Sequence, residues 1–300
     1  MSATDLLILQ AIHNYGVLST PQIYELVKEH CSSILYLKRR LRDLNHEDCI
    51  VFDGKEYQGP LLCRPSAQLN THNARSNYLV YMLDDAGERI LQAIGHWSEN
   101  RPKGISPFAH ACFASTIQAS LAVGFRERGF RWQPQHEFLD LKKTTLGAPV
   151  PYWWDGMFQP PRTLRSDGLA VADYNGSYRL FEIEADRGTE AADTNDDEKK
   201  SLKRNVLQWQ QFIQEGIYKQ HYHTEKVGLI VLNFFTTQRR LENFLAIVEQ
   251  ETGANRYQWA KVVPEFHGLF RPQAILPDIY RTPFKRAGYP DIDIFDPQAR

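Results

Sequence analysis

The chain has 300 residues, of which 42% are hydrophobic and 12% aromatic, and its formal net charge is −1. This length suits two domains, each with its own core. The near-neutral charge excludes binding to nucleic acid or anionic membranes through overall attraction. No apolar run approaches the roughly 18 residues of a membrane span, and the start lacks a basic and apolar leader. The four cysteines lack C-x-x-C spacing, so we expect reduced thiols in a cytoplasmic protein that does not enter a membrane.

The first 95 residues show helical spacing of apolar residues, followed by strand patterns. Ser19-Thr20-Pro21 marks one helix start, because a hydroxyl cap before proline is typical there. We predict helices at 5–15, 20–29 and 33–45, strands at 49–52 and 77–83 separated by a long polar loop, and a helix at 83–91. Three helices followed by a two-stranded wing is the order of a winged helix-turn-helix.

The third predicted helix has a basic outer face. Its inner face is expected to carry Ile34, Leu37, Leu41 and Leu44. Outward Lys and Arg side chains suit contacts with phosphates and guanine, and the wing loop adds further cations. The predicted DNA-binding residues are Lys38, Arg39, Arg40, Arg42, Arg64 and Arg75. The alternatives are a solvated basic face without function and a module for protein interaction or dimerisation.

A polar segment with Pro and Gly at 96–107 predicts a linker. The expected organisation is an N-terminal domain at 1–95, the linker at 96–107, a second domain at 108–270 and an irregular tail at 271–300. Within the second domain we predict a helix at 108–128, a strand at 131–139, a proline-containing loop at 142–165, strands at 169–174 and 178–185 joined by Asn175-Gly176, a helix at 197–222, a strand at 226–233, a helix at 238–251 and a strand at 259–263.

Carboxylates gather on one predicted strand. Side chains alternate along a strand, so Glu182, Glu184 and Asp186 share one face. Three acids on one face repel each other, and a divalent metal supplies a suitable counter-charge. Asp167, at the start of the neighbouring strand, could complete the set. We therefore predict a Mg²⁺ site with Asp167 and Glu184 as ligands. The alternative is an ordinary polar strand edge with surface acids.

The order helix, strand, strand, strand, helix, strand resembles the core of restriction-endonuclease-like, PD-(D/E)XK-type folds. This resemblance implies an Asp at the start of the second strand and an acid-x-Lys on the third, where the lysine orients the attacking water. Asp167 fits the first position, and either Glu182-Ile183-Glu184 or Glu184-Ala185-Asp186 fits the second, but neither run has the lysine. The chain then recruits a base from elsewhere, for which Lys203 is best placed, or has lost cleavage and only grips DNA. The candidate catalytic residues are Asp167, Glu182, Glu184, Asp186 and Lys203.

The N-terminal pattern and the run Glu184-Ala185-Asp186-Arg187-Gly188-Thr189-Glu190 together resemble the replication-relaxation family of plasmid and mobile-element proteins. In that family the run follows a Pro-Asp-like strand, whereas Arg165-Ser166-Asp167-Gly168 lacks the proline here. The resemblance implies an α+β chain with a winged helix and a nuclease-like domain that acts on DNA in replication or relaxation. The expected partner is double-stranded DNA, with a relaxase or replication protein and a second copy of the chain as further candidates. Two alternatives stay open: an active Mg²⁺-dependent endonuclease or nickase, and a transcriptional regulator whose second domain dimerises or senses a partner.

Overall fold

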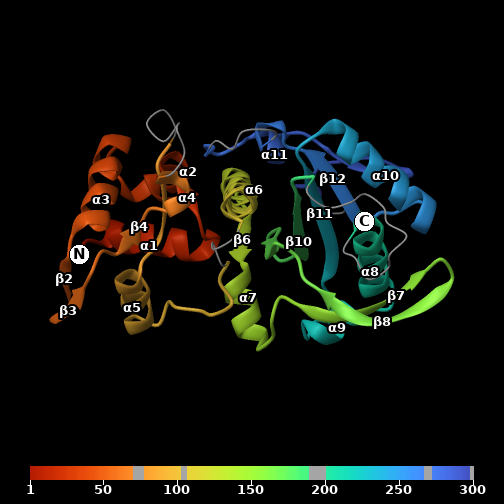
Figure 1. Ribbon diagram of the computed structural model, residues 1–300, viewed down its shortest axis with the longest axis horizontal. Helices are drawn as coiled ribbons and strands as arrows, with labels where there is room; N and C mark the ends of the chain where they lie inside the picture. The colour runs from red at the N-terminus through yellow and green to blue at the C-terminus, as the bar shows by residue number, and fades with distance from the viewer. Residues whose placement is uncertain (70–77, 103–106, 189–200, 267–271, 298–300) are drawn as a thin grey trace. The chain divides into compact units, whose positions relative to one another are not determined.

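The computed structural model describes residues 1–69, 78–102, 107–188, 201–266 and 272–297 (Figure 1). The protein is a mixed chain of helices and several sheets. It divides into two compact units, Met1–Val123 with Phe270–Pro277 and Gly124–Leu269 with Asp278–Arg300. The division falls within helix α6 (Phe108–Glu127), so the predicted linker at 96–107 does not coincide with the boundary between the compact units.

The first unit begins with the three predicted helices, whose ends follow from local capping. Helix α1 (Ala3–Tyr15) starts at a capping box formed by Ser2 and ends at Gly16, which has a positive φ of 85°. Helix α2 (Thr20–Val27) starts at a second capping box, formed by Ser19 and Gln22, and continues into the 3-10 helix η1 (Lys28–His30). Helix α3 (Ile34–His46) starts where the Ser33 side chain accepts a hydrogen bond from the Tyr36 N–H. These helices confirm the sequence prediction.

The inner face of α3 is narrower than predicted. Leu37, Leu41 and Leu44 are fully buried, but Ile34 is 36% exposed. Ile34 lies in the first turn, four residues before Lys38, and residues four apart share one side of a helix. The expectation that Ile34 belongs to the core is therefore wrong, and this residue lies in line with Lys38.

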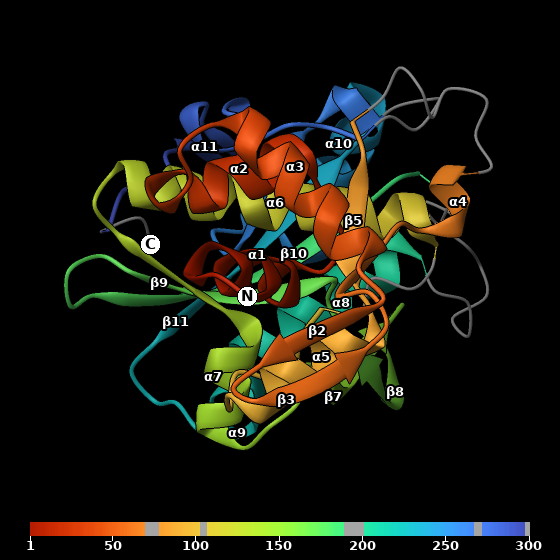
Figure 2. The same cartoon turned by 90° about the vertical axis from the view of Figure 1, so that its left-hand side faces the viewer.

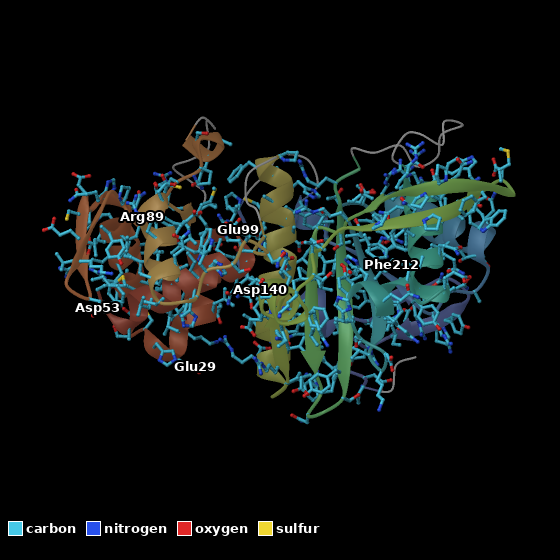
Figure 3. The ribbon with its side chains drawn as sticks, turned by 90° about the horizontal axis from the view of Figure 1, so that it is seen from below. Glu29, Asp53, Arg89, Glu99, Asp140 and Phe212 are labelled. Carbon is cyan, nitrogen blue, oxygen red and sulfur yellow. The ribbon has the colours of Figure 1, made fainter. Side chains whose placement is uncertain are left out.

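The strands of the first unit pair differently from the prediction. Strand β2 (Cys49–Phe52) forms a hairpin with β3 (Lys55–Gln58), and Asp53, labelled at its tip in Figure 3, has a φ of 49° beside Gly54 at 72°. An Asp-Gly pair with positive φ closes such a two-residue turn. Strand β5 (Val80–Leu83) instead pairs with β1 (Leu18–Ser19) and β4 (Leu62–Cys63). The predicted wing of 49–52 with 77–83 is thus wrong, because the Asp-Gly turn closes the hairpin locally. The unit also contains α4 (Ser66–Leu69) and α5 (Asp85–Ala93).

The second unit is built on a seven-stranded sheet in the order β14-β13-β12-β11-β10-β9-β6 (Figure 1). It contains the predicted hairpin of β9 (Gly168–Asp173) and β10 (Tyr178–Asp186), turned at Asn175-Gly176 with φ values of 58° and 102°. Strand β10 runs parallel to β11 (Gly228–Phe235), which runs parallel to β12 (Gln258–Val262). The outer strands are β6 (Arg131–Pro134), β13 (Phe284–Arg286) and β14 (Tyr289–Ile292).

Several predicted elements of this unit need correction. The strand expected at 131–139 ends at Pro134, which lacks the N–H that would continue the ladder, and α7 (Gln135–Lys142) follows. The expected loop at 142–165 is a hairpin of β7 (Ala148–Trp154) and β8 (Met157–Leu164). Its turn is Asp155-Gly156, with φ values of 49° and 79°. The hairpin is a separate two-stranded sheet, where proline is tolerated at an edge.

The second half of the unit differs from the prediction in two further places. The described part of the helix expected at 197–222 is two helices, α8 (Leu202–Gln214) and α9 (Ile217–His221), separated by Gly216 at a φ of 66°. The tail expected to be irregular contributes α11 (Asp278–Arg281) and the edge strands β13 and β14. Burial of Phe284 and Ile292 ties this tail to the sheet. Helix α10 (Gln238–Thr252) agrees with the prediction.

The two faces of the sheet are covered differently. Figure 1 shows α8 and α10 on one face. There Trp209 and Phe212, the latter labelled in Figure 3, pack in one cluster with Leu180 and Val231. On the opposite face Phe181 has ring contacts with Phe125, Trp132 and Trp259. Glu182, Glu184 and Asp186 lie on the first of these faces, where they contact Tyr222, Trp209 and Arg240.

Helix α6 is the one described helix whose length and composition could cross a membrane, with a mean hydropathy of 1.3. However, 78% of its apolar window is buried inside the protein, as in the core helix of a soluble protein. Its apolar character is therefore explained by burial. All four cysteines are free thiols, as predicted from their spacing.

Candidate functional site

Two groups of charged side chains carry the functional predictions, and the first is the outer face of α3 in the first unit (Figure 2). Lys38, Arg39 and Arg42 are exposed there. The Arg42 side chain is 68% exposed and lies 3.5 Å from the Asp43 carboxylate, while Lys38 and Arg39 have no ion pair within the part of the chain that the structure describes. Exposed cations on one helix face can reach a ligand without first breaking an internal contact.

Arg40 does not share this exposed position. Its Nε and Nη2 lie 3.0 and 3.1 Å from the two oxygens of Asp5, and its Nη1 lies 3.2 Å from Asp43. Asp5 is fully buried. Burial alone would raise the pKa of Asp5, but hydrogen bonds from Arg40 and Ser2 outweigh it, so the pKa is lowered. Arg40 thus joins α3 to α1, which corrects its prediction as an outward DNA contact.

The remaining predicted cations lie after β4. Arg64 is partly buried, and its Nε is buried without a hydrogen-bond partner among the described residues. Arg75 lies outside the described residues.

The second group is the row of carboxylates on β10. The Asp167 N–H donates to the Ile183 carbonyl at 2.9 Å, and Asp167 Oδ2 accepts from the Ala185 N–H at 2.8 Å. Asp167 directly precedes β9, and these two hydrogen bonds hold it against the β10 backbone on either side of Glu184. Asn233 of β11 pairs with Glu184 on the other side of β10. The two predicted metal ligands therefore lie on neighbouring segments of the chain.

Glu182 is fully buried and differs from its neighbours in chemistry. It accepts hydrogen bonds of 2.5 Å from the Ser166 and Tyr222 hydroxyls. Burial raises its pKa from 4.5 to about 7, although both hydrogen bonds act in the opposite direction. A carboxyl that is protonated over part of the neutral range is a poor metal ligand, because metals bind the ionised form.

Glu184 and Asp186 also have partners on the covering helices. Glu184 Oε1 accepts from the Trp209 indole at 3.0 Å. Asp186 forms a 2.8 Å ion pair with Arg240, and both side chains are mostly buried. The predicted common face of the three acids is confirmed, but each acid contacts a different residue. A positive side chain, Arg240, supplies part of the counter-charge that the sequence prediction assigned to metal.

Lys203 is not placed beside this row. Its Nζ lies 2.9 Å from Asp155 and 3.2 Å from Glu251. Burial opposes its charge, but these two hydrogen bonds raise its pKa. Glu251 and the Asp186 partner Arg240 are eleven residues apart on α10, which is about 16 Å along a helix. The structure thus assigns Lys203 a contact between α8, α10 and the β7–β8 turn.

Asp167 and Glu184 are the residues that could hold a divalent ion. Mg²⁺ is usually bound by one or two carboxylates and keeps several waters, and these two carboxylates are of the type that such a site uses. No group of three or more His, Cys, Asp or Glu side chains suited to a metal occurs in the described parts of the chain. The residues therefore suit a weakly held ion better than a fully protein-bound one.

Four partners of the acids were not predicted from the sequence. They are Ser166, Trp209, Tyr222 and Arg240. Ser166 could have been identified, because it directly precedes the predicted Asp167. The other three carry no local signal, since they reach β10 from helices 25 to 54 residues away in the sequence.

Comparisons with known proteins identify the family of the chain. The family model described as replication-relaxation matches residues 9–227, so the chain belongs to the replication-relaxation family. The family resemblance drawn from the Glu184–Glu190 run is confirmed. No curated protein matches the chain. Among solved structures, a chain described as "Structure of SdaI restriction endonuclease" is similar over 91% of this chain and 90% of that chain, with 10% identity and a TM-score of 0.22.

Proposed function

We propose that the chain is a DNA-binding protein of a plasmid or mobile element that acts in replication or relaxation, and that its first unit is a winged helix-turn-helix. The observation that carries the proposal is the exposed basic face of α3, with Lys38, Arg39 and Arg42, followed directly by the β2–β3 hairpin. Membership of the replication-relaxation family supports it.

In this proposal α3 enters the major groove of duplex DNA and the hairpin contacts the phosphate backbone. Lys38, Arg39 and Arg42 neutralise phosphates or contact guanine edges, and Lys55 near the hairpin tip is exposed to do the same. Because the net charge of the chain is only −1, binding depends on this local patch and weakens steeply with salt.

Fluorescence anisotropy with a labelled duplex from the origin of the element tests the proposal. The double variant Arg39→Ala, Arg42→Ala is expected to bind at least about tenfold more weakly than the wild type, since each lost phosphate contact removes counterion release. The control variant Lys226→Ala removes an exposed lysine of the second unit and is expected to bind normally. Equal affinity of the double variant and the wild type would contradict the proposal.

A second candidate function is metal-dependent DNA cleavage by a restriction-endonuclease-like second unit. It is favoured by one observation, the hydrogen bonds that hold Asp167 against the β10 backbone on either side of Glu184. A bound Mg²⁺ would supply Lewis-acid chemistry at a phosphate. Lys203 is disfavoured as the catalytic base, because its ammonium group is paired with Asp155 and Glu251. We therefore rank cleavage below binding.

Conversion of supercoiled plasmid to nicked or linear DNA with Mg²⁺ or Mn²⁺ tests this candidate. The expected result is cleavage by the wild type and by Lys203→Ala, but not by the double variant Asp167→Ala, Glu184→Ala. That result would establish a nuclease that uses this metal site and does not use Lys203 as its base. No cleavage by the wild type with either metal would reject the enzymatic function and leave the DNA-binding proposal standing.

A further inference from the structure

A pocket of about 410 Å³ opens beside α3 in the first unit and is lined in part by α3 and β5. Both elements are labelled in Figure 2. This volume lies within the roughly 300–1,000 Å³ range of small-molecule sites. Its lining comes from the start of α2, one side of α3, the residue after β4, and β5 with the residues before it. The lining residues are Thr20, Pro21, Ile34, Lys38, Arg42, Asn45, His46, Arg64, Tyr78, Leu79 and Tyr81. We call it the α3 pocket.

Two stripes of α3 explain how the pocket forms. The first stripe, Leu37, Leu41 and Leu44, faces the core. The second stripe lies beside it and faces outward. Ile34, Lys38 and Arg42 follow each other at intervals of four residues, which sets them along one side of the helix. This second stripe is the α3 wall of the pocket, and it accounts for the exposure of Ile34.

The pocket is basic. Lys38, Arg42 and Arg64 contribute cations, His46 can add another, and none of the described lining residues is acidic. The Nε of Arg64 is buried without a hydrogen-bond partner among the described residues. An anion in the pocket would meet the Lys38 and Arg42 side chains and the part of Arg64 that lines the cavity with charge-assisted contacts.

Aromatic and apolar surfaces complete the pocket. Tyr81 is 3% exposed, whereas Tyr78 is 50% exposed and Ile34 is 36% exposed. The backbone around Tyr78 is held by Gln68, which donates to the Tyr78 carbonyl at 2.7 Å and accepts from the Val80 N–H at 3.0 Å. Burial raises the pKa of Tyr81 while Arg64 acts to lower it, as expected for a cation near the phenol. Aromatic, apolar and cationic groups therefore line one cavity.

We propose that the α3 pocket binds a single nucleotide, with its base against Tyr78 and Ile34 and its phosphate on Arg64, Lys38 and Arg42. Stacking on aromatic side chains and charge-assisted contacts to phosphate are the two interactions that recognise a nucleotide outside a helix. A base inside a duplex is stacked on both faces, so only an unpaired or extruded nucleotide can enter. The same chemistry is present in a free nucleoside monophosphate.

This inference rests on the proposed function, because DNA is the proposed source of the nucleotide. The pocket shares Lys38 and Arg42 with the outer face of α3, which is proposed to contact DNA. It extends that function from duplex backbone binding to a strand that is locally opened. Opened DNA is the substrate form in which a replication or relaxation protein works, and a pocket on the same helix would favour it over closed duplex.

The test compares the full chain on three probes: a closed duplex, the same duplex with one unpaired nucleotide, and free thymidine 5′-monophosphate. The wild type is expected to bind the duplex with the unpaired nucleotide about tenfold more tightly than the closed duplex, as one stacked base provides. Tyr78→Ala and Arg64→Gln are each expected to abolish this preference. Arg39 lies outside the pocket, so Arg39→Ala is expected to weaken binding of both duplexes by the same factor.

The outcomes separate this inference from the proposed function. Binding of both duplexes by the wild type with equal affinity, together with no binding of the free nucleotide, would overturn the α3 pocket as a nucleotide site and leave duplex binding intact. Binding of the free nucleotide by the wild type but not by Tyr78→Ala, without binding of either duplex, would support the pocket and reject the DNA-binding function. A preference for the unpaired nucleotide that persists in both Tyr78→Ala and Arg64→Gln would also overturn the inference.

Discussion

The outer face of α3 and the carboxylate row of β10 are both dense in charge, but they differ in how the charges are held. Lys38, Arg39 and Arg42 are exposed on α3, whereas Glu182 and Glu184 are buried beneath α8 and accept hydrogen bonds from Tyr222 and Trp209. Exposed charges are available to a partner, whereas buried acids are already engaged by internal donors. The comparison supports the proposed DNA contact at α3 and indicates a structural role for much of β10.

The largest expected effect concerns Arg40, a predicted DNA contact that is instead paired with the buried Asp5. Arg40→Ala leaves the buried Asp5 without its guanidinium, and breaking such a pair costs roughly 3–5 kcal/mol. Urea denaturation of the full chain measures it. Arg39→Ala, on the exposed side of the same helix, is the matched control and is expected to change the free energy of unfolding by less than about 0.5 kcal/mol. Equal effects of the two variants would contradict the distinction between exposed and structural cations.

Glu182 makes the stability of the second unit depend on pH. Its pKa is raised to about 7 from 4.5, so the folded state binds the proton more tightly, and stability is lost as pH rises from 4.5 through 7. The free energy of unfolding of the wild type is expected to fall by about 2 kcal/mol between pH 5 and pH 8, relative to that of Glu182→Gln, which cannot ionise at this position. Denaturation at both pH values measures this difference. Parallel pH dependence in the two proteins would show that Glu182 stays ionised in the fold.

Loss of the hydrogen bond to Glu184 is expected to lower the stability of the second unit by a smaller amount. Trp209→Phe removes the indole N–H that donates to it at 3.0 Å, while keeping most of the aromatic packing. Loss of one donor to a buried acid is expected to cost about 1–2 kcal/mol. Trp153→Phe is the control, because Trp153 is 53% exposed, and it is expected to have little effect on thermal unfolding. If Trp153→Phe destabilises as much as Trp209→Phe, the hydrogen bond is not the cause.

These contrasts show what the sequence alone could predict. Helix starts at Ser19 and Ser33 and the hairpin at Asn175-Gly176 depend on a few neighbouring residues, so local patterns were sufficient there. The first helix begins at Ala3, two residues before the predicted start, because Ser2 caps it. The common face of the acids on β10 follows from strand alternation in the same way. Local patterns failed where two signals competed. At 142–165 the prolines favoured a loop, although Asp155-Gly156 turns a hairpin there.

The partners of the charged residues could not be predicted for a different reason. The Arg40–Asp5 pair spans 35 residues and the Arg240–Asp186 pair spans 54. Each depends on how separate helices and strands pack, and no spacing within one segment encodes that. For this reason Lys203, which follows the acids in the sequence, was expected beside them, although it contacts Asp155 and Glu251 instead.

The most direct measurement of the central claim is the dependence of duplex affinity on salt for the wild type and for Lys38→Ala, Arg39→Ala and Arg42→Ala. If α3 contacts phosphates, the logarithm of affinity falls linearly with the logarithm of salt concentration, and each variant reduces the slope by about 0.9. The control Lys226→Ala is expected to keep the wild-type slope. The same slope in all four α3 proteins, wild type included, would contradict the account, because the basic face of α3 would then not contact the DNA.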